Sequence, residues 1–321
     1  MSQFKRSQSK YVKKAYRVRN WPEYEAGLRN RGNLTVWVSI TGGTLPNWDA
    51  PRQEKRKPGR QRSYSDHAIE TAVTLGMVFH LASRQTEGFL RSLLDLLNLD
   101  NNVPDHTTIS RRKAKLGKVF FHRANSTTPV HILIDSSGLA VHVGQLRNPP
   151  KSRDYRKLHL CVDERTGDVL ACDLTSGSAR DSTRVVSLIG QIGRPIASVR
   201  ADAAYDARGV YEAIENHRAD RSPRVLIAPR KDAQLASKSV NSRERNRNIR
   251  ARARLGKRRW HVESGYSKRS KVETSFHRYK IIVGPAMRAR GFSSQEVEAR
   301  IGCKILNTMA ALGMPDGEMI G

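Results

Sequence analysis

Three acidic residues, Asp135, Asp202 and Glu273, are of the type that holds divalent metal ions. Asp135 ends the apolar run 130–135 and Asp202 follows the apolar run 196–201, so each is expected at the end of a buried strand. A charge placed there costs free energy unless a metal or a partner compensates it. Either residue alone is commonly a strand-ending or helix-capping acid. The metal-site interpretation therefore depends on a third group.

Glu273 supplies that group from a predicted helix. Tyr266, Arg269, Glu273 and Lys280 are separated by three, four and seven residues. At about 100° per residue they fall within roughly 60° of arc, so one helix face presents all four. A carboxylate flanked by two cations and a phenol suits a site that binds both metal and phosphate. The plain alternative is an exposed helix with incidental charge pairs.

Three carboxylates can hold two divalent ions about 4 Å apart, one activating the attacking oxygen and the other stabilising the leaving oxygen of an in-line phosphoryl transfer. Hard oxygen ligands favour Mg²⁺, with Mn²⁺ as a substitute. No His or Cys pairing indicates zinc: His131, His142 and His159 are expected to be core or surface residues. The three scattered cysteines are expected to be reduced core thiols.

The charge of the chain indicates a polyanionic partner. Lys and Arg number 58 against 30 Asp and Glu, a net charge of +28 over 321 residues. Such an excess strains a compact fold unless a polyanion such as nucleic acid neutralises it, although a basic surface that serves only solubility is the alternative. No apolar run approaches the roughly 20 residues that span a bilayer, so we expect a cytoplasmic protein without a membrane partner.

The first two parts of the chain are predicted to be a basic arm and a helical domain. Residues 1–62 are expected to be an irregular arm or linker. Residues 63–125 show helical patterns from Ser65, over 86–97 and over 105–113, the last polar and basic. This order is typical of a helix-turn-helix DNA-binding domain, although many small helical domains bind nothing. The residues expected to contact base edges or phosphates are Thr107, Thr108, Ser110, Arg111 and Arg112.

Residues 126–321 have an α/β pattern that predicts a mixed sheet with helices on its faces. Ser137-Gly138 is expected to turn the chain between strands 130–135 and 139–143. The other expected elements are strands 157–163, 168–175, 196–201 and 223–228, and helices 181–192, 206–218, one through Glu273, and 293–312. The basic segment 230–260, including Arg258 and Arg259, is expected to grip DNA phosphates.

Taken together, these motifs resemble the DDE transposases of bacterial insertion sequences, particularly the insertion-sequence-five group of the insertion-sequence-four superfamily. Tyr266-x-x-Arg269-x-x-x-Glu273-x-x-x-x-x-x-Lys280 matches the Y-R-E-K signature of that group in residue type and spacing. The segments 133–139 and 201–206 resemble the motifs around the first and second aspartates. The resemblance extends over nearly the whole sequence.

The resemblance implies a ribonuclease-H-like core with a mixed five-stranded sheet, Asp135 on the first strand, Asp202 just after the fourth and Glu273 on a later helix. It implies that water releases a 3′-hydroxyl at the transposon end and that this hydroxyl attacks target DNA. Arg269 and Lys280 would contact phosphates, and Tyr266 or Trp260 would stack on an unpaired base. The implied partners are double-stranded DNA and a second copy of the chain, in the bacterial nucleoid.

Three alternatives remain open at this point. A DNA-binding regulator with structural carboxylates, or an inactive transposase remnant, would bind DNA without metal-dependent cleavage. A structure-specific nuclease of the same fold would cut DNA without joining strands.

Overall fold

The computed structural model describes residues 15–40, 45–51, 62–116, 128–141, 155–217, 222–236 and 243–320. His142, the expected strand end at 142–143 and parts of the expected arm and basic segment lie outside these ranges. No helix in the described part of the chain is long and apolar enough to cross a membrane.

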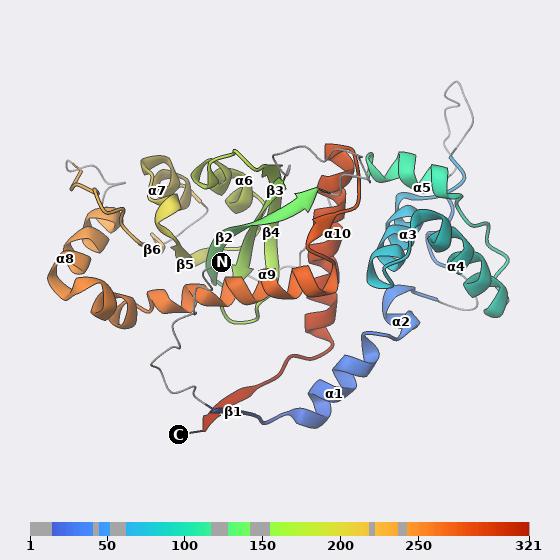
Figure 1. The fold of residues 1–321 in the computed structure, drawn as a ribbon, viewed down its shortest axis with the longest axis horizontal. Coiled ribbons are helices and arrows are strands. Elements are labelled where there is room, and N and C mark those ends of the chain that lie inside the picture. Colours follow the sequence, from blue (N-terminus) through green and yellow to red (C-terminus); the bar gives the residue numbers. More distant parts are fainter. Residues whose placement is uncertain are drawn as a thin grey trace, which may run out of the picture.

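A mixed sheet forms the centre of the molecule (Figure 1), as the sequence predicts. Its order is β4-β3-β2-β5-β6, with β7 paired to the far end of β2. β3 is antiparallel to both β2 and β4, whereas β5 is parallel to β2 and to β6. The strands are β2 (Val130–Val141), β3 (Tyr155–Asp163), β4 (Val169–Ser176), β5 (Ile196–Ala201), β6 (Arg224–Ile227) and β7 (Ala286–Met287).

The predicted turn at Ser137-Gly138 is wrong. β2 is one continuous strand of 12 residues, and Ser137 and Gly138 stay paired with Leu158 and Lys157 of β3. A Cβ at Gly138 would make ordinary van der Waals contact with the Tyr155 ring at 3.6 Å, so the strand does not require glycine there. Pairing with β3, and with β7 two residues later, keeps the chain extended. Asp135 therefore lies inside a long strand, and not at the end of a short one.

Two hydrophobic clusters cover the two faces of the sheet. Ile132 and Ile134 pack toward α6 (Val185–Gly190) and α7 (Arg208–Glu215). Leu133 and Leu139 belong to the other cluster, with residues of α9 (Lys271–Ile282) and α10 (Phe292–Ala311). Because side chains alternate along a strand, Asp135 is directed to the face that α9 covers.

The three predicted helices of the next region are present: α3 (Asp66–Val78), α4 (Ser83–Leu96) and α5 (His106–Lys113). Ser65 caps α3 by accepting a hydrogen bond from the Ala68 amide at 3.0 Å. These helices share one hydrophobic cluster with α9 and α10, and Figure 1 shows α10 between them and the sheet.

The expectation of an irregular segment before residue 62 is wrong for its described part. It contains α1 (Trp21–Asn30), with a proline in its first turn, and α2 (Leu34–Trp37), which Asn33 caps through the Thr35 amide. Trp37 anchors this part to the core cluster, a packing role that local composition does not show. β1 (Ala15–Val18) pairs with β8 (Gly317–Ile320) and joins both ends of the described chain.

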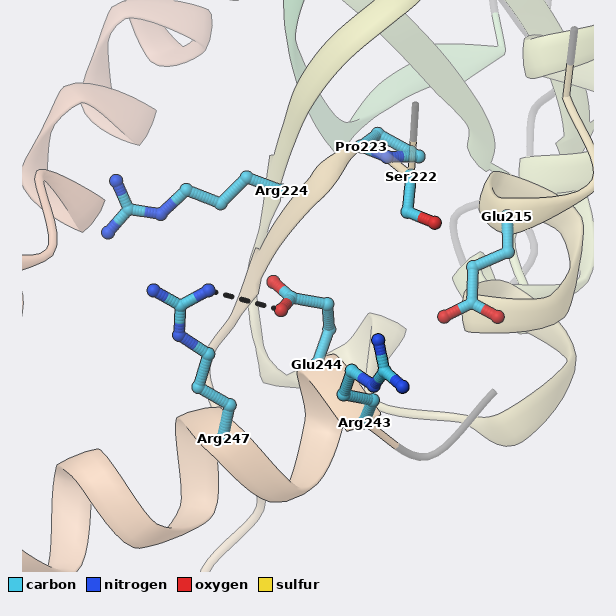
Figure 2. Close-up of a pocket in the computed structure, with 7 residues that line it drawn as sticks. All are labelled: Glu215, Ser222, Pro223, Arg224, Arg243, Glu244 and Arg247. Atoms are coloured by element: carbon cyan, nitrogen blue, oxygen red, sulfur yellow. Dashed lines mark hydrogen bonds and ion pairs between the residues drawn. The ribbon is translucent and has the colours of Figure 1, made fainter. Parts of the chain in front are cut away.

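The basic segment forms α8 (Arg243–Glu263), which is kinked at Gly256, where φ is 73°. A positive φ favours glycine, so the kink is built into the sequence. Asn248 donates to the Val225 carbonyl at 2.8 Å and Glu244 accepts from the Val225 amide at 3.1 Å. Figure 2 shows the start of α8 beside β6, where Arg247 pairs with Glu244 at 3.2 Å. Polar side chains of α8 thus satisfy backbone groups of the edge strand.

The remaining short elements are 3₁₀ turns. The expected helix 181–192 consists of η1 (Asp181–Arg184) followed by α6. η2 (Ala203–Tyr205) follows β5, and η4 (Tyr266–Ser270) precedes α9.

Candidate active site

The strand register brings Asp135 and Asp202 together. Ile134 and Ala201, which precede them, are direct partners in the parallel pair β2–β5. Asp202 caps η2, where its Oδ1 accepts a hydrogen bond from the Ala204 amide at 2.9 Å. That capping bond uses one carboxylate oxygen. Asp135 on β2 and Asp202 directly after the neighbouring strand β5 are thus brought together.

Glu273 joins this pair through Arg269. The guanidinium of Arg269 donates from Nη1 to Asp135 Oδ2 at 2.6 Å and from Nη2 to Glu273 Oε1 at 2.8 Å. The Asp135 side chain is 15% exposed, whereas that of Glu273 is 59% exposed. Arg269 therefore joins the largely buried carboxylate of Asp135 to the solvent-exposed carboxylate of Glu273.

The predicted single helix from Tyr266 to Lys280 is wrong in one respect. Tyr266 and Arg269 lie on η4, and Glu273 and Lys280 lie on α9. The tighter 3₁₀ turn still directs Arg269 toward Glu273 four residues later. Lys280 donates to the Ser137 hydroxyl at 2.7 Å, two residues beyond Asp135 on β2.

The pKa of the Asp135 carboxyl is raised, first because burial removes it from water. The negative charge of Asp202 raises this pKa further, against the opposing effects of the Ser136 amide and Arg269. The fold thus gathers more negative charge here than one arginine neutralises. A cation bound between these carboxylates would relieve that repulsion.

The residues fit a divalent metal by chemistry, although the side chains do not form a coordination site as they stand. Within the described ranges, no three His, Cys, Asp or Glu side chains are grouped closely enough to hold a metal ion. Arg269 lies between Asp135 and Glu273. Its Nη1 binds an oxygen of Asp135, and its Nη2 binds an oxygen of Glu273. The oxygens of Asp135, Asp202 and Glu273 are the hard ligands that Mg²⁺ and Mn²⁺ prefer.

Trp260 is not positioned to stack on a base, contrary to the expectation. Its side chain is 1% exposed, and its ring packs 5.0 Å from that of Tyr266, which is 8% exposed. His261 packs against Tyr266 at 4.7 Å. Burial raises the pKa of the Tyr266 phenol most, Arg269 opposes this rise, and Asp202 and Asp135 add to it. The aromatic cluster thus supports the turn that carries Arg269.

The expected DNA contacts of α5 are mostly engaged within the protein. Asp105 caps α5 and accepts hydrogen bonds from the hydroxyls of Thr107 and Thr108. Arg112 is anchored to the Tyr64 carbonyl and to Asp66. Ser110 and Arg111 are exposed. In the basic segment Arg258 is exposed, and Arg259 pairs with Glu263.

The sequence interpretation missed a buried ion-pair network beneath the site. Arg200 on β5 donates to Glu164 and to the Gly265 carbonyl, the latter at 3.1 Å. Lys268 pairs with the other oxygen of Glu164 at 3.0 Å, and Lys271 donates to the Glu164 carbonyl at 3.1 Å. This network fixes η4, and with it Arg269, to the sheet. The sequence did offer one signal of this network, because Arg200 is a charged residue inside an otherwise apolar strand.

A second missed anchor follows Asp202. Asp206, whose side chain is fully buried, accepts from Arg245 of α8 at 2.8 Å and from the Arg230 amide at 3.1 Å. This pair holds the start of α8 near the second aspartate.

Comparison with known families decides the assignment. A family model described as "Transposase DDE domain" matches residues 126–308, which is more than half of the chain. The chain belongs to the DDE transposase family. A second model with the same description matches residues 29–144. The matched ranges of these two models include the helical region and the described sheet.

Solved structures with some likeness are also transposases. The Drosophila P element transposase strand transfer complex is 11% identical, with a TM-score of 0.32, over 53% of this chain and 42% of that one. The Mos1 transposase paired-end complex with the left transposon end is 13% identical, with a TM-score of 0.23, over 73% of this chain and 82% of that one. A mariner Mos1 paired-end complex with Mg is 11% identical, with a TM-score of 0.23, over 74% of this chain and 84% of that one. This chain thus spans less than half of the P element transposase chain.

Proposed function

We propose that this chain is an insertion-sequence transposase that binds terminal inverted repeats, cleaves DNA there and joins the freed end to target DNA. The observation that carries the proposal is that Asp135 on β2 and Asp202, directly after the neighbouring strand β5, lie together, with Glu273 tied to Asp135 through Arg269. Family membership supports the same chemistry.

The strand order supports a ribonuclease-H-like core. β2 is the first strand of this sheet in sequence and lies at the centre of the order β4-β3-β2-β5-β6, β3 and β4 are antiparallel neighbours, and β5 is the fourth strand in sequence. Asp135 then lies on the first strand and Asp202 directly after the fourth. The spacing of Tyr266, Arg269, Glu273 and Lys280 supports the insertion-sequence-five group.

Asp135, Asp202 and Glu273 would hold Mg²⁺, or Mn²⁺ in its place. Bound ions supply activation of the attacking oxygen and stabilisation of the leaving oxygen in phosphoryl transfer. Arg269 would then release a carboxylate and bind a phosphate oxygen, since a guanidinium suits both. Lys280, held by Ser137 at 2.7 Å, would bind a second phosphate near the cut.

The partner is double-stranded DNA at transposon ends and target. The net charge of +28 and the exposed Ser110, Arg111 and Arg258 support DNA contact by α5 and α8. A homodimer on DNA brings two ends together, and the bacterial nucleoid is where such an enzyme meets its substrate.

The test is cleavage and strand transfer on DNA that carries the element's own ends, with Mg²⁺. Glu273→Gln should abolish both reactions and retain end binding, whereas the matched control Glu23→Gln, an exposed residue of α1, should behave as wild type. Equal activity of Glu273→Gln and wild type would remove Glu273 from the mechanism. Cleavage without strand transfer would indicate a nuclease, and metal-independent binding without cleavage would indicate a regulator.

A further inference from the structure

A groove of about 1020 Å³ lies between the helical region and the segment that joins α9 to α10. Its apolar lining comes from both sides: Val73 and Met77 of α3 and Ile109 of α5 on one, and Ile281 and Val283 on the other. Ile281 is 65% exposed. The groove therefore offers accessible apolar surface within a strongly basic protein.

The charged residues of the groove are mostly cations. Lys113, Lys280, Arg288 and Arg290 line it, and Glu298 is the one acidic residue among the described lining. Glu298 is 3% exposed and already accepts from Lys113 at 3.2 Å and from the Arg288 and Ala289 amides at 2.8 and 2.9 Å. Its charge is therefore used to hold the groove wall together.

Two of these cations are free of acidic partners. Arg288 and Arg290 are exposed, and neither makes an ion pair with any residue in the described ranges. Arg288 contacts His80 Nδ1 of the opposite wall at 2.9 Å. An anionic occupant would thus meet two unneutralised guanidinium groups.

The groove lies next to the residues of β2 that follow Asp135. Lys280 lines the groove and also donates to Ser137, two residues from Asp135 on β2. β7, at the other side of the groove, pairs with Ala140 and Val141 of the same strand. Ser110 of α5 lines the far wall. A chain that leaves the carboxylates past Lys280 therefore enters the groove.

We propose that this groove binds an unpaired DNA strand beside the cleaved phosphate, with phosphates on Arg288 and Arg290 and bases against the apolar floor. This inference rests on the proposed function. Basic grooves with apolar surface for base faces bind single strands largely without sequence preference. The groove volume of about 1020 Å³ lies near the upper end of small-ligand pockets, which leaves room for unpaired nucleotides.

The first test measures equilibrium binding of the whole protein to a duplex transposon end with and without a single-stranded extension. Arg288→Ala/Arg290→Ala should weaken binding of the extended DNA by roughly fivefold or more and lower its salt slope by about 1.4, since each single-strand phosphate contact contributes about 0.7. Binding of the blunt duplex should change little. The control Arg29→Ala/Arg208→Ala, which removes two exposed arginines outside the groove, should leave both unchanged.

Because binding is measured without cleavage, this result is independent of the carboxylate site. Equal weakening of blunt and extended DNA would overturn the assignment of an unpaired strand. Unchanged DNA binding with loss of self-association would show that a second copy of the chain occupies the groove, and would also overturn it.

A second test locates the strand. Ile281→Cys introduces an exposed thiol in the groove, whereas the native cysteines are buried. It should form a disulfide with a thiol-bearing nucleotide in the extension and not with one inside the duplex. A control Val186→Cys, exposed on α6 on the other face of the sheet, should form neither. Cross-linking at the duplex position alone would contradict the proposal.

Discussion

Arg200 and Arg269 both bind carboxylates on the same face of the sheet, yet their surroundings differ. Arg200 is 7% exposed, and its carboxylate partner is Glu164, which Lys268 also neutralises. Burial lowers the pKa of Arg200 more than Glu164 raises it. Burial also acts against the charge of Arg269, but attraction from Asp135, Tyr266, Glu273 and Asp202 outweighs it and raises the pKa.

The difference separates a structural ion pair from a binding site. In the Arg200 network, Arg200 and Lys268 both neutralise the single carboxylate of Glu164, and Arg200 also binds the Gly265 carbonyl. The Arg269 cluster keeps surplus negative charge beside solvent-exposed Glu273. A site that must accept a cation needs that surplus, whereas a network that positions a turn does not.

The largest expected effect is on DNA cleavage, which should depend much more on the Arg269 cluster than on the Arg200 network. Asp135→Asn should reduce cleavage about a thousandfold, or ~4 kcal/mol in activation free energy, because it removes a charged metal ligand. Glu164→Gln should reduce cleavage much less, since Glu164 acts only by positioning η4. Turnover on end DNA at saturating Mg²⁺ measures both. Comparable losses in the two variants would erase the distinction, and Asp100→Asn, an exposed control, should match wild type.

For stability we expect the opposite order, with the Arg200 network mattering more than the Arg269 cluster. Arg200→Met should lower the free energy of unfolding by about 3 kcal/mol, because it leaves Glu164 buried with weaker compensation. Arg269→Met should cost about 1 kcal/mol, because Glu273 stays in water and Asp135, whose pKa is already raised, can take up a proton when it loses its partner. Urea unfolding of the two variants measures this, and a larger loss for Arg269→Met would contradict the assignment of roles.

The smallest effect concerns pH. The pKa of Asp135 is raised above its ordinary value of 3.8, mainly by burial, so ionised Asp135 destabilises the folded state at neutral pH. Asp135→Asn should therefore be as stable as wild type or slightly more stable at about pH 7. As the pH falls through the raised pKa toward 3.8, wild type takes up the proton and the advantage of the variant should disappear. Urea midpoints at about pH 7 and about pH 4 test the sign. If the stability advantage of Asp135→Asn over wild type grew as the pH fell, the predicted direction of the Asp135 pKa shift would be wrong.

Local patterns in the sequence predicted most of the elements that position the site. The mixed sheet and the helices that begin after Ser65 and Asp105 follow from apolar periodicity and from the polar residues at the helix starts. The Ser137-Gly138 turn was wrong because pairing with β3, which local sequence does not reveal, keeps both residues in the strand.

Contacts between distant residues could not be predicted in the same way. Arg200 meets Glu164 and Gly265 only after the strands pair, and Trp260 loses its solvent exposure only when Tyr266 folds against it. Residue type and spacing indicated which groups carry chemistry, but tertiary packing determines which of them are free to act.

The central claim, that these carboxylates are metal ligands, is tested most directly by Asp202→Cys. A thiolate binds the hard Mg²⁺ poorly and softer ions better, so cleavage should be lost with Mg²⁺ and restored in part with Mn²⁺. Wild type should cleave with either ion, and Asp202→Ala with neither. The native cysteines are buried and should not contribute. Cleavage by Asp202→Cys at the wild-type rate with Mg²⁺ would contradict the account, because Asp202 would then not hold the metal.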